Sequence, residues 1–372
     1  MAPAPTAFDP AQAFMTATQE PSALVPHRKF IRSWLRASST QNTALALCLV
    51  AMDVIAFGAT IIAVIKVRFL VFKLALGLLA GFIIARLFII GHDACHQSLT
   101  PHRRLNAILG RLTFLPSLTP YSLWDTGHNI VHHGYTNLKG FDMVWQPLTI
   151  EDFRTLPRWR QGLERSYRSG WMPGLYYLVE IWWLRMYFPA KRYMPTRRGV
   201  FIYDGVLASL SALSWLGLLT GAAISTHQSV SLLLISGFLL PLMTWSSLIG
   251  FVIYVHHTHP RIAWYSDKAA WSQAQPFVST TVHVTFKSIA GINMDTLLHH
   301  ILQHTAHHVD MTIPLYRLKQ AQAILEKRLP GCIVIQPFSW RWYFETARQC
   351  KLYDYQACRW TDFNGIPAKE PS

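Results

Sequence analysis

The sequence predicts an all-α integral membrane protein with four transmembrane helices and a helical cap, on one side of the membrane, that carries a histidine-ligated metal site. Three observations predict this fold. Of the 372 residues, 51% are hydrophobic and only 14% are charged, and the mean hydropathy is +0.20, a balance typical of membrane proteins. Four apolar stretches are long enough to cross a hydrocarbon core of about 30 Å. Histidines cluster close to where two of these stretches end, and again further along the chain.

The four apolar stretches form two pairs. The first span is expected over residues 44–65, where Asp53 is the only charged residue, and the second over residues 69–90. The short segment between them allows only a tight turn. The second pair is expected over residues 201–225 and 231–255, and neither of these spans has a charged residue near its centre.

The segments outside the spans are expected to build the cap and the two ends of the chain. Residues 1–43 are expected to be a disordered Ala- and Pro-rich tail that leads into a basic amphipathic stretch suited to the membrane interface. Residues 44–322 are expected to form the membrane domain, and residues 323–372 a cytoplasmic tail. Residues 108–124 are apolar but interrupted by prolines, which favours a re-entrant or interfacial piece. Residues 171–189 are rich in Trp and Tyr, as at the headgroup level, although a soluble helix packed on the domain is the alternative.

Two tight pairs of spans return the chain to the side of the membrane that it left. The cap segments and both termini therefore share one side. Lys and Arg are abundant in these segments, whereas the opposite side has little beyond Lys66 and Arg68. By the positive-inside rule we expect the cap, the histidine clusters and both termini in the cytoplasm of a multi-pass membrane protein, with a bacterial inner membrane as the expected location. The formal charge of +15 then reflects cytoplasmic loops and contacts with membrane lipid, and no nucleic acid partner is expected.

Three histidine clusters carry the candidate chemistry. Their patterns are HxxxH, HxxxHH and HxxHH, and their members are His92, His96, His128, His132, His133, His304, His307 and His308. A structural zinc site is complete with about four protein ligands, so eight histidines are too many for one ion. Imidazole nitrogen suits iron, copper, zinc and nickel. The clusters therefore predict two metal ions without specifying the element.

Helix geometry leaves one position in the second cluster open. On a regular α-helix His128 and His132 share a face, but His133 lies about 140° from His128. Either His133 binds from the side or the backbone is distorted there. Asp93 and Asp310 lie beside clustered histidines, and both are candidates for carboxylates that orient the imidazole rings.

Three stretches resemble a known family. They are Gly91-His-Asp-Ala-Cys-His96, Trp124-Asp-Thr-Gly-His128-Asn-Ile-Val-His132-His133-Gly-Tyr-Thr-Asn137 and His304-Thr-Ala-His307-His308-Val-Asp-Met-Thr-Ile-Pro314-Leu-Tyr. In these motifs the chain resembles the integral-membrane fatty acid desaturase superfamily, whose three histidine boxes bind a non-haem di-iron centre. The resemblance covers about residues 86–322. The Ile-Pro-Leu-Tyr tail and the His-Thr-His-Pro after the fourth span resemble the bacterial and cyanobacterial acyl-lipid Δ12, or ω-6, type.

The resemblance implies that the eight box histidines bind two iron ions with a ninth ligand. The family position of that ninth ligand, five residues before the first histidine of box three, points to His299. Helix geometry instead favours His300, about 40° from His304, whereas His299 lies about 140° away. His256, His257, His259 and His283 are interpreted as residues that line the site or orient its ligands, with ordinary loop histidines as the alternative.

The resemblance also implies the reaction: O2 and two electrons introduce a cis double bond into a fatty acyl lipid, at the Δ12 position of an oleoyl group. Because no electron-carrier module is recognisable in the chain, a separate ferredoxin-like or cytochrome b5-like protein is expected to donate the electrons. A di-iron membrane hydroxylase or ketolase acting on alkanes or carotenoids is the nearest alternative. A metal transporter or sensor is disfavoured, because the histidines lie at the membrane face and not at mid-span.

Overall fold

The computed structural model describes residues 25–189, 191, 198–273, 276–288 and 290–369. Four helical stretches in it are long and apolar enough to cross a membrane: α3 (Thr43–Lys66), α4 (Leu70–Cys95), α10 (Gly199–Ser225) and the continuous stretch Val230–His257. The last stretch consists of α11 (Val230–Leu234), a π-helix η5 (Ile235–Leu239) and α12 (Leu240–His257). The four predicted spans are confirmed. The second and fourth continue past their predicted ends, so that they carry histidines into the cap.

Helix α4 packs at very short distance against the fourth span, on η5 and on the start of α12. A Cβ atom at Gly77 would lie 2.4 Å from the carbonyl oxygen of Ser236, and a Cβ at Gly81 would lie 2.5 Å from the Cβ of Thr244. These two glycines are one turn apart on α4, and their lack of a side chain lets the helix backbones approach, as small residues do between membrane helices. The close packing fixes the histidine-bearing ends of α4 and α12 relative to each other.

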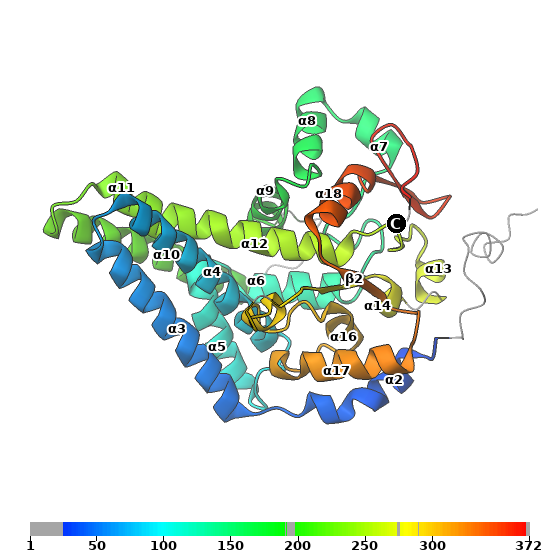
Figure 1. The fold of residues 1–372 in the computed structure, drawn as a ribbon, viewed down its shortest axis with the longest axis horizontal. Coiled ribbons are helices and arrows are strands. Elements are labelled where there is room, and N and C mark those ends of the chain that lie inside the picture. Colours follow the sequence, from blue (N-terminus) through cyan, green and yellow to red (C-terminus); the bar gives the residue numbers. More distant parts are fainter. Residues whose placement is uncertain (1–24, 190, 192–197, 274–275, 289, 370–372) are drawn as a thin grey trace, which may run out of the picture.

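The turns that join each pair of spans lie together at one end of the bundle. Gln228 donates from Nε2 to the carbonyl of Ile65 at 2.7 Å, and Arg68 donates from Nη2 to the carbonyl of Thr226 at 3.0 Å. Figure 1 shows α11 at this far end and most of the shorter elements gathered at the other. The structure thus brings the three boxes to one side of the bundle, as the pairing of the spans predicted.

The shorter helices are α2 (Arg28–Leu35), η1 (Arg36–Ser39), α5 (Arg103–Phe114), η2 (Leu115–Ser117), α6 (Tyr121–Asp125), the π-helix η3 (Thr126–His132), α7 (Ile150–Thr155), α8 (Arg158–Tyr167), α9 (Pro173–Tyr176), the π-helix η4 (Tyr177–Tyr187), α13 (Lys268–Gln273), α14 (Pro276–Ser279), α15 (Met294–Leu297), α16 (His304–Val309), α17 (Leu315–Arg328) and α18 (Trp340–Gln349). Residues 108–124 thus fold as the end of α5, the turn η2 and α6, with α5 packed against α4. Residues 171–189 form α9 and η4, which pack against α12. Both segments therefore buttress the helices that carry the histidines.

Two small sheets accompany the helices in the cap. Strand β1 (Val282–Thr285) pairs in parallel with β2 (Val334–Pro337), with Val282 opposite Val334. Strand β3 (Leu352–Asp354) pairs antiparallel with β4 (Arg359–Thr361). The fold is therefore predominantly helical, and these strands are a minor addition to the predicted all-α class.

The C-terminal segment folds onto the membrane domain and is not a separate tail. The boundary expected at residue 322 falls inside α17. Trp342, Tyr353 and Trp360 are buried in the same hydrophobic cluster as Trp245 of α12. The expectation of a tail is corrected because large apolar side chains in this polar stretch are spaced too widely to register as a span, yet they suffice to fill the cap core.

The N-terminal segment is described from residue 25 onward, so the expected disordered stretch lies largely outside the described residues. Its basic amphipathic part forms α2, as the pattern of residues indicated. Ile31 and Leu35 are fully buried in a cluster with Leu318 and Leu325 of α17. The cap thus covers Ile31 and Leu35, whereas Phe30 of the same helix stays exposed.

Candidate metal centre

Nine histidines from four parts of the chain form two groups inside the cap. Their candidate ligand atoms lie within 4.8 Å of one another in each group. The first group comprises His92, His96, His128, His133 and His307, and the second comprises His132, His257, His304 and His308. The structure therefore brings together all eight box histidines, and His257 at the end of α12 joins them.

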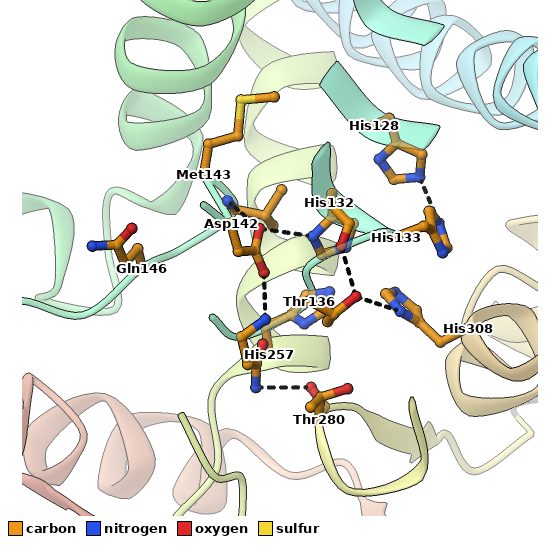
Figure 2. Close-up of polar contacts among 12 residues, drawn as sticks. His128, His132, His133, Thr136, Asp142, Met143, Gln146, His257, Thr280 and His308 are labelled. Atoms are coloured by element: carbon orange, nitrogen blue, oxygen red, sulfur yellow. Dashed lines mark hydrogen bonds and ion pairs between the residues drawn. The ribbon is translucent and has the colours of Figure 1, made fainter. Parts of the chain in front are cut away.

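A π-helix divides the second box between the two groups. In η3 the amide of His133 donates to the carbonyl of His128 at 3.0 Å, the five-residue spacing of a π-turn. This spacing places His128 and His133 on one face, with their Nε2 atoms 3.1 Å apart, and turns His132 toward the second group. Figure 2 shows the same separation of the three rings. Of the two possibilities left open by the sequence, the distorted backbone is the one observed.

The third box is divided in a different way, by regular helical geometry. His304 and His308 are one turn apart on α16, and their Nε2 atoms are 3.1 Å apart in the second group. His307 points to the first group, where its Nε2 is 3.1 Å from that of His133. The short helix α16 thus supplies both groups.

The distances between imidazole nitrogens fit metal coordination. Neighbouring Nε2 atoms are separated by 3.0 Å for His92 and His128, 3.3 Å for His92 and His96, and 3.1 Å for His257 and His304. Two nitrogens that bind one ion at about 2.1 Å and at right angles would lie about 3.0 Å apart. Where Nδ1 donates a hydrogen bond, as in His132 and His308, the Nε2 atom of the neutral ring keeps only a lone pair, which is the group that binds a metal ion.

Burial keeps these imidazoles neutral. The pKa values of six histidines in these groups are held well below the usual 6.5, chiefly because burial penalises the charged ring and secondly because neighbouring histidines would repel it; they are His96, His128, His133, His304, His307 and His308. A neutral imidazole has a free lone pair, which is the form that binds a metal ion. The environment of the two groups therefore favours ligation over protonation.

Two side chains orient histidines of the second group through their Nδ1 atoms. His132 donates from Nδ1 to Asp142 Oδ1 at 2.9 Å, and Asp142 also accepts from the amides of Asn137 and Val144 (Figure 2). The Thr136 hydroxyl donates to the His132 carbonyl at 2.7 Å, which leaves its oxygen to accept from His308 Nδ1 at 3.4 Å. These contacts turn each Nε2 toward the group.

Asp142 was missed in the sequence analysis. The available signal was an acidic residue followed by Met143, Val144 and Trp145, all of which are buried. An acidic side chain in such a stretch needs a hydrogen-bonding partner inside the protein. Asp93, in contrast, was expected beside the ligands, and its Oδ1 lies 3.4 Å from His92 Nδ1. Its other oxygen accepts from the amide of Leu315 at 2.5 Å.

His299, the expected ninth ligand, lies in neither group. Its Nε2 donates to Asp53 Oδ2 at 2.7 Å, and Arg86 donates from Nε to the other oxygen of Asp53 at 3.0 Å. The partly buried Arg86 neutralises the one acidic residue of the first span through an ion pair at 2.9 Å, and His299 adds a hydrogen bond to the same carboxylate. Burial lowers the pKa of His299 despite the nearby carboxylate.

His300 also lies outside both groups, where it donates from Nδ1 to Asp295 Oδ2 at 2.7 Å. His300 would share a face with His304 only if the helix of box three extended back to this residue. Instead His299 and His300 have positive φ angles of 51° and 61°, and α16 begins only at His304. The backbone turn at His299 and His300 breaks the angular relation from which His300 was assigned, whereas His299 was assigned from the family position alone.

The other residues expected to line the site or to orient its ligands also lie outside both groups; they are His256, His259, His283 and Asp310. His256 stacks on His304 with ring centroids 4.0 Å apart, and neither of its ring nitrogens has a hydrogen-bond partner among the described residues. His259 contacts Gln336, and His283 contacts Glu326 at 2.5 Å. Asp310 accepts from Thr312 instead of orienting an imidazole.

The comparisons with known proteins agree with the histidine pattern. Residues 69–338 match the model of the fatty acid desaturase family. The chain is 28% identical over 281 residues to the sn-1 oleoyl-lipid 12-desaturase of Picosynechococcus sp., which covers 74% of this chain and 75% of that protein. It is 26% identical over 270 residues to the protein of the same name from Synechocystis sp., covering 72% of each. It is also 27% identical over 276 residues to the chloroplastic omega-6 fatty acid desaturase of Glycine max. That match covers 74% of this chain and 61% of the soybean protein, less than two thirds of its length.

Proposed function

Because the chain belongs to the fatty acid desaturase family, we propose that it introduces a cis double bond into an acyl chain of a membrane lipid, at the Δ12 position of an oleoyl group. The observation that carries this proposal is the pair of histidine groups at the cap ends of α4 and α12. The position of the bond is supported by relatives named as oleoyl-lipid 12-desaturases and omega-6 desaturases.

Two iron ions are the proposed cofactor, one held by the five histidines of the first group and one by the four of the second. This assignment takes His257 as the ninth ligand. When bound, the two irons supply the O2-activating redox chemistry that removal of hydrogen from a saturated carbon pair requires. The balance is that one CH2–CH2 unit, O2, two electrons and two protons give one CH=CH unit and two waters.

The residues of the chain prepare the site for this reaction in three ways. Burial keeps the imidazoles neutral and holds bulk water away. Asp142 and Thr136 orient His132 and His308 through hydrogen bonds to their Nδ1 atoms. The apolar spans hold the acyl chain next to the cap, since an acyl chain offers no polar group at mid-chain for recognition.

The direct test is expression of the chain, with a compatible electron donor, in cells that make oleate but no linoleate. We expect linoleate in the fatty acid methyl esters, with the double bond located by mass spectrometry. His307→Ala should abolish the product, whereas His102→Ala, a change to an exposed histidine outside both groups, should not. Hydroxylated fatty acids or oxygenated carotenoids would support the hydroxylase or ketolase alternative instead.

We further propose that the cap faces the cytoplasm of a bacterial cell, with the protein in the inner membrane. Support comes from the excess of Lys and Arg in the cap segments and from the position of both short turns at the opposite end. Reporter fusions after Ile65 and Ser225 should report the periplasm, and a fusion at Gly140 the cytoplasm. A periplasmic signal at Gly140 would contradict the orientation.

The electron donor is proposed to be a separate acidic protein of the ferredoxin or cytochrome b5 type that approaches the basic cap. Attraction between opposite charges steers association and weakens as salt screens it. Reduction of the purified enzyme by such a donor should therefore slow as ionic strength rises. A rate independent of salt would speak against an electrostatically steered donor.

A further inference from the structure

Helix α2, which precedes the first span, touches the end of the third histidine box. Arg28 donates from Nη2 to the carbonyl of His308 at 2.9 Å and from Nε to the carbonyl of Val309 at 3.1 Å. Arg32 donates from Nε to the same Val309 carbonyl at 2.9 Å. The guanidinium groups of Arg28 and Arg32 thus contact the C-terminal end of α16, which lies about 280 residues further along the chain.

The end of α16 needs such donors. The last four carbonyl groups of any α-helix lack partners within the helix, and α16 has only six residues, all of them buried. The amide of Asp310 donates to the carbonyl of Ala306 at 3.1 Å and so satisfies one of the four. The carbonyls of His308 and Val309 are satisfied by Arg28 and Arg32. A cation at this end also complements the partial negative charge of the helix C-terminus.

The arginines are themselves held in place. Ile31 and Leu35, on the inner face of α2, are fully buried against α17. The guanidinium of Arg328 in α17 lies 4.9 Å from the ring centroid of Trp34. Within α16 itself, the amide of Ala306 donates to Gln322 of α17 at 2.9 Å. Helix α16 is therefore held by hydrogen bonds to both α17 and α2.

We propose that α2 is a clamp that positions the third histidine box, with Arg28 and Arg32 as positioning residues for the second metal group. The selectivity follows from the contacts: the gripped carbonyls belong to His308, a member of that group, and to the residue after it. Both arginines lie outside residues 69–338, the part that matches the family model. The clamp therefore comes from a part of this chain that the family match does not include. Its consequence for metal binding rests on the proposed di-iron centre.

The first test does not depend on metal. Amide hydrogen exchange of the metal-free protein is compared between the double variant Arg28→Ala/Arg32→Ala and the control Lys29→Ala/Arg36→Ala. The control removes the same charge from exposed positions on the same segment. We expect faster exchange over residues 304–310 in the first variant only. Equal exchange in both variants would overturn the clamp, as would faster exchange across the whole cap, since that would indicate general unfolding.

The second test measures release of iron to a chelator from the purified, loaded protein. We expect one of the two irons to leave about ten- to a hundredfold faster in Arg28→Ala/Arg32→Ala, the range typical for loss of a group that supports a ligand, with the other unchanged. Arg28→Lys/Arg32→Lys, which keeps donors at both positions, should fall between this variant and the wild type. Uniform acceleration of both irons would overturn the selectivity. Absence of linoleate in cells would count against the proposed function, whereas unchanged exchange and release would count against the clamp.

Discussion

Single residues decide how the histidines are divided. His257 was expected to line the site or to serve as an alternative ligand, and it lies with His132, His304 and His308, whereas His299 contacts Asp53. The two histidines can be separated by experiment because their partners differ. One faces only other imidazoles through its Nε2, and the other faces a carboxylate within the span region.

We predict that His257→Ala lowers bound iron from two ions to one per chain, because it removes one of only four nitrogens in the second group. His299→Ala should keep both irons but reduce stability by about 1–3 kcal/mol, because the buried carboxylate of Asp53 loses a hydrogen bond. Metal analysis and thermal unfolding of the purified variants measure the two effects. The reverse pattern, with iron lost in His299→Ala alone, would restore the ligand position implied by the family resemblance.

Asp142→Asn is predicted to weaken iron binding in the second group about ten- to a hundredfold. The amide can accept from only one side, whereas the carboxylate accepts from His132 and from two backbone amides. Competition with a chelator measures the affinity. Glu345→Gln, an exchange of the same kind on α18 far from the histidines in sequence, is the control and should leave the affinity unchanged. Equal affinities in both variants would remove Asp142 from the site.

At the scale of elements, the contact of α4 with α12 sets the distance between the first box and His257. A methyl group at Gly81 would lie 2.5 Å from the Cβ and 3.0 Å from the Cγ2 of Thr244, and 2.6 Å from the carbonyl of Pro241. The neighbours include backbone, which cannot rotate away. The two helices must therefore separate to accept any side chain at this position.

Gly81→Ala is accordingly predicted to destabilise the protein by about 1–3 kcal/mol, the usual cost of overpacking. Gly58→Ala on α3 is the matched control, since its methyl group would meet nothing within 4 Å. That change should be neutral or stabilise by up to about 1 kcal/mol, because alanine is the better helix former. Thermal unfolding in detergent compares the two. If both variants melted alike, close packing at Gly81 would not be limiting.

At the scale of the whole molecule, the cap encloses a cluster of buried histidines that could take up protons. The pKa values of His96, His304 and His307 are held well below 6.5 by burial, while the same groups in the unfolded chain would titrate near 6.5. The unfolded state therefore binds more protons below that pH. The stability that these groups contribute is complete above about pH 7 and is lost as the pH falls.

The metal-free protein is thus predicted to melt at progressively lower temperature between about pH 6.5 and 5, with a loss of up to about 1.4 kcal/mol per pH unit for each such histidine. Differential scanning calorimetry across this range measures it. His307→Ala should flatten the dependence and His102→Ala should not. A melting temperature that stayed constant or rose on acidification would show that the imidazoles are not held neutral by the fold.

Much of this architecture was predictable because it depends on composition and period. Long apolar runs must span, since a bilayer offers no partner to backbone polar groups, and the short returns between them must bring the boxes to one side. The choice of the eight box histidines and the prediction of two metal sites followed from spacing and number alone, and the structure gathers these histidines into two groups. Whether His133 shares a face with His128 could not be decided from the sequence, because no residue pattern in a single sequence identifies a π-turn.

Tertiary structure decided the rest. His257, Asp142 and the arginines of α2 act through neighbours that are distant in sequence, and no local period reports such a contact. The same holds for residues 323–372, whose widely spaced aromatic residues become a core only when α12 and β1 are beside them. By itself the sequence determined that the three histidine boxes gather on one side of the membrane. The folded chain determined which histidine joins which group. That division depends on the local backbone conformation, such as the π-turn in η3, and on which side chains lie beside each buried ring.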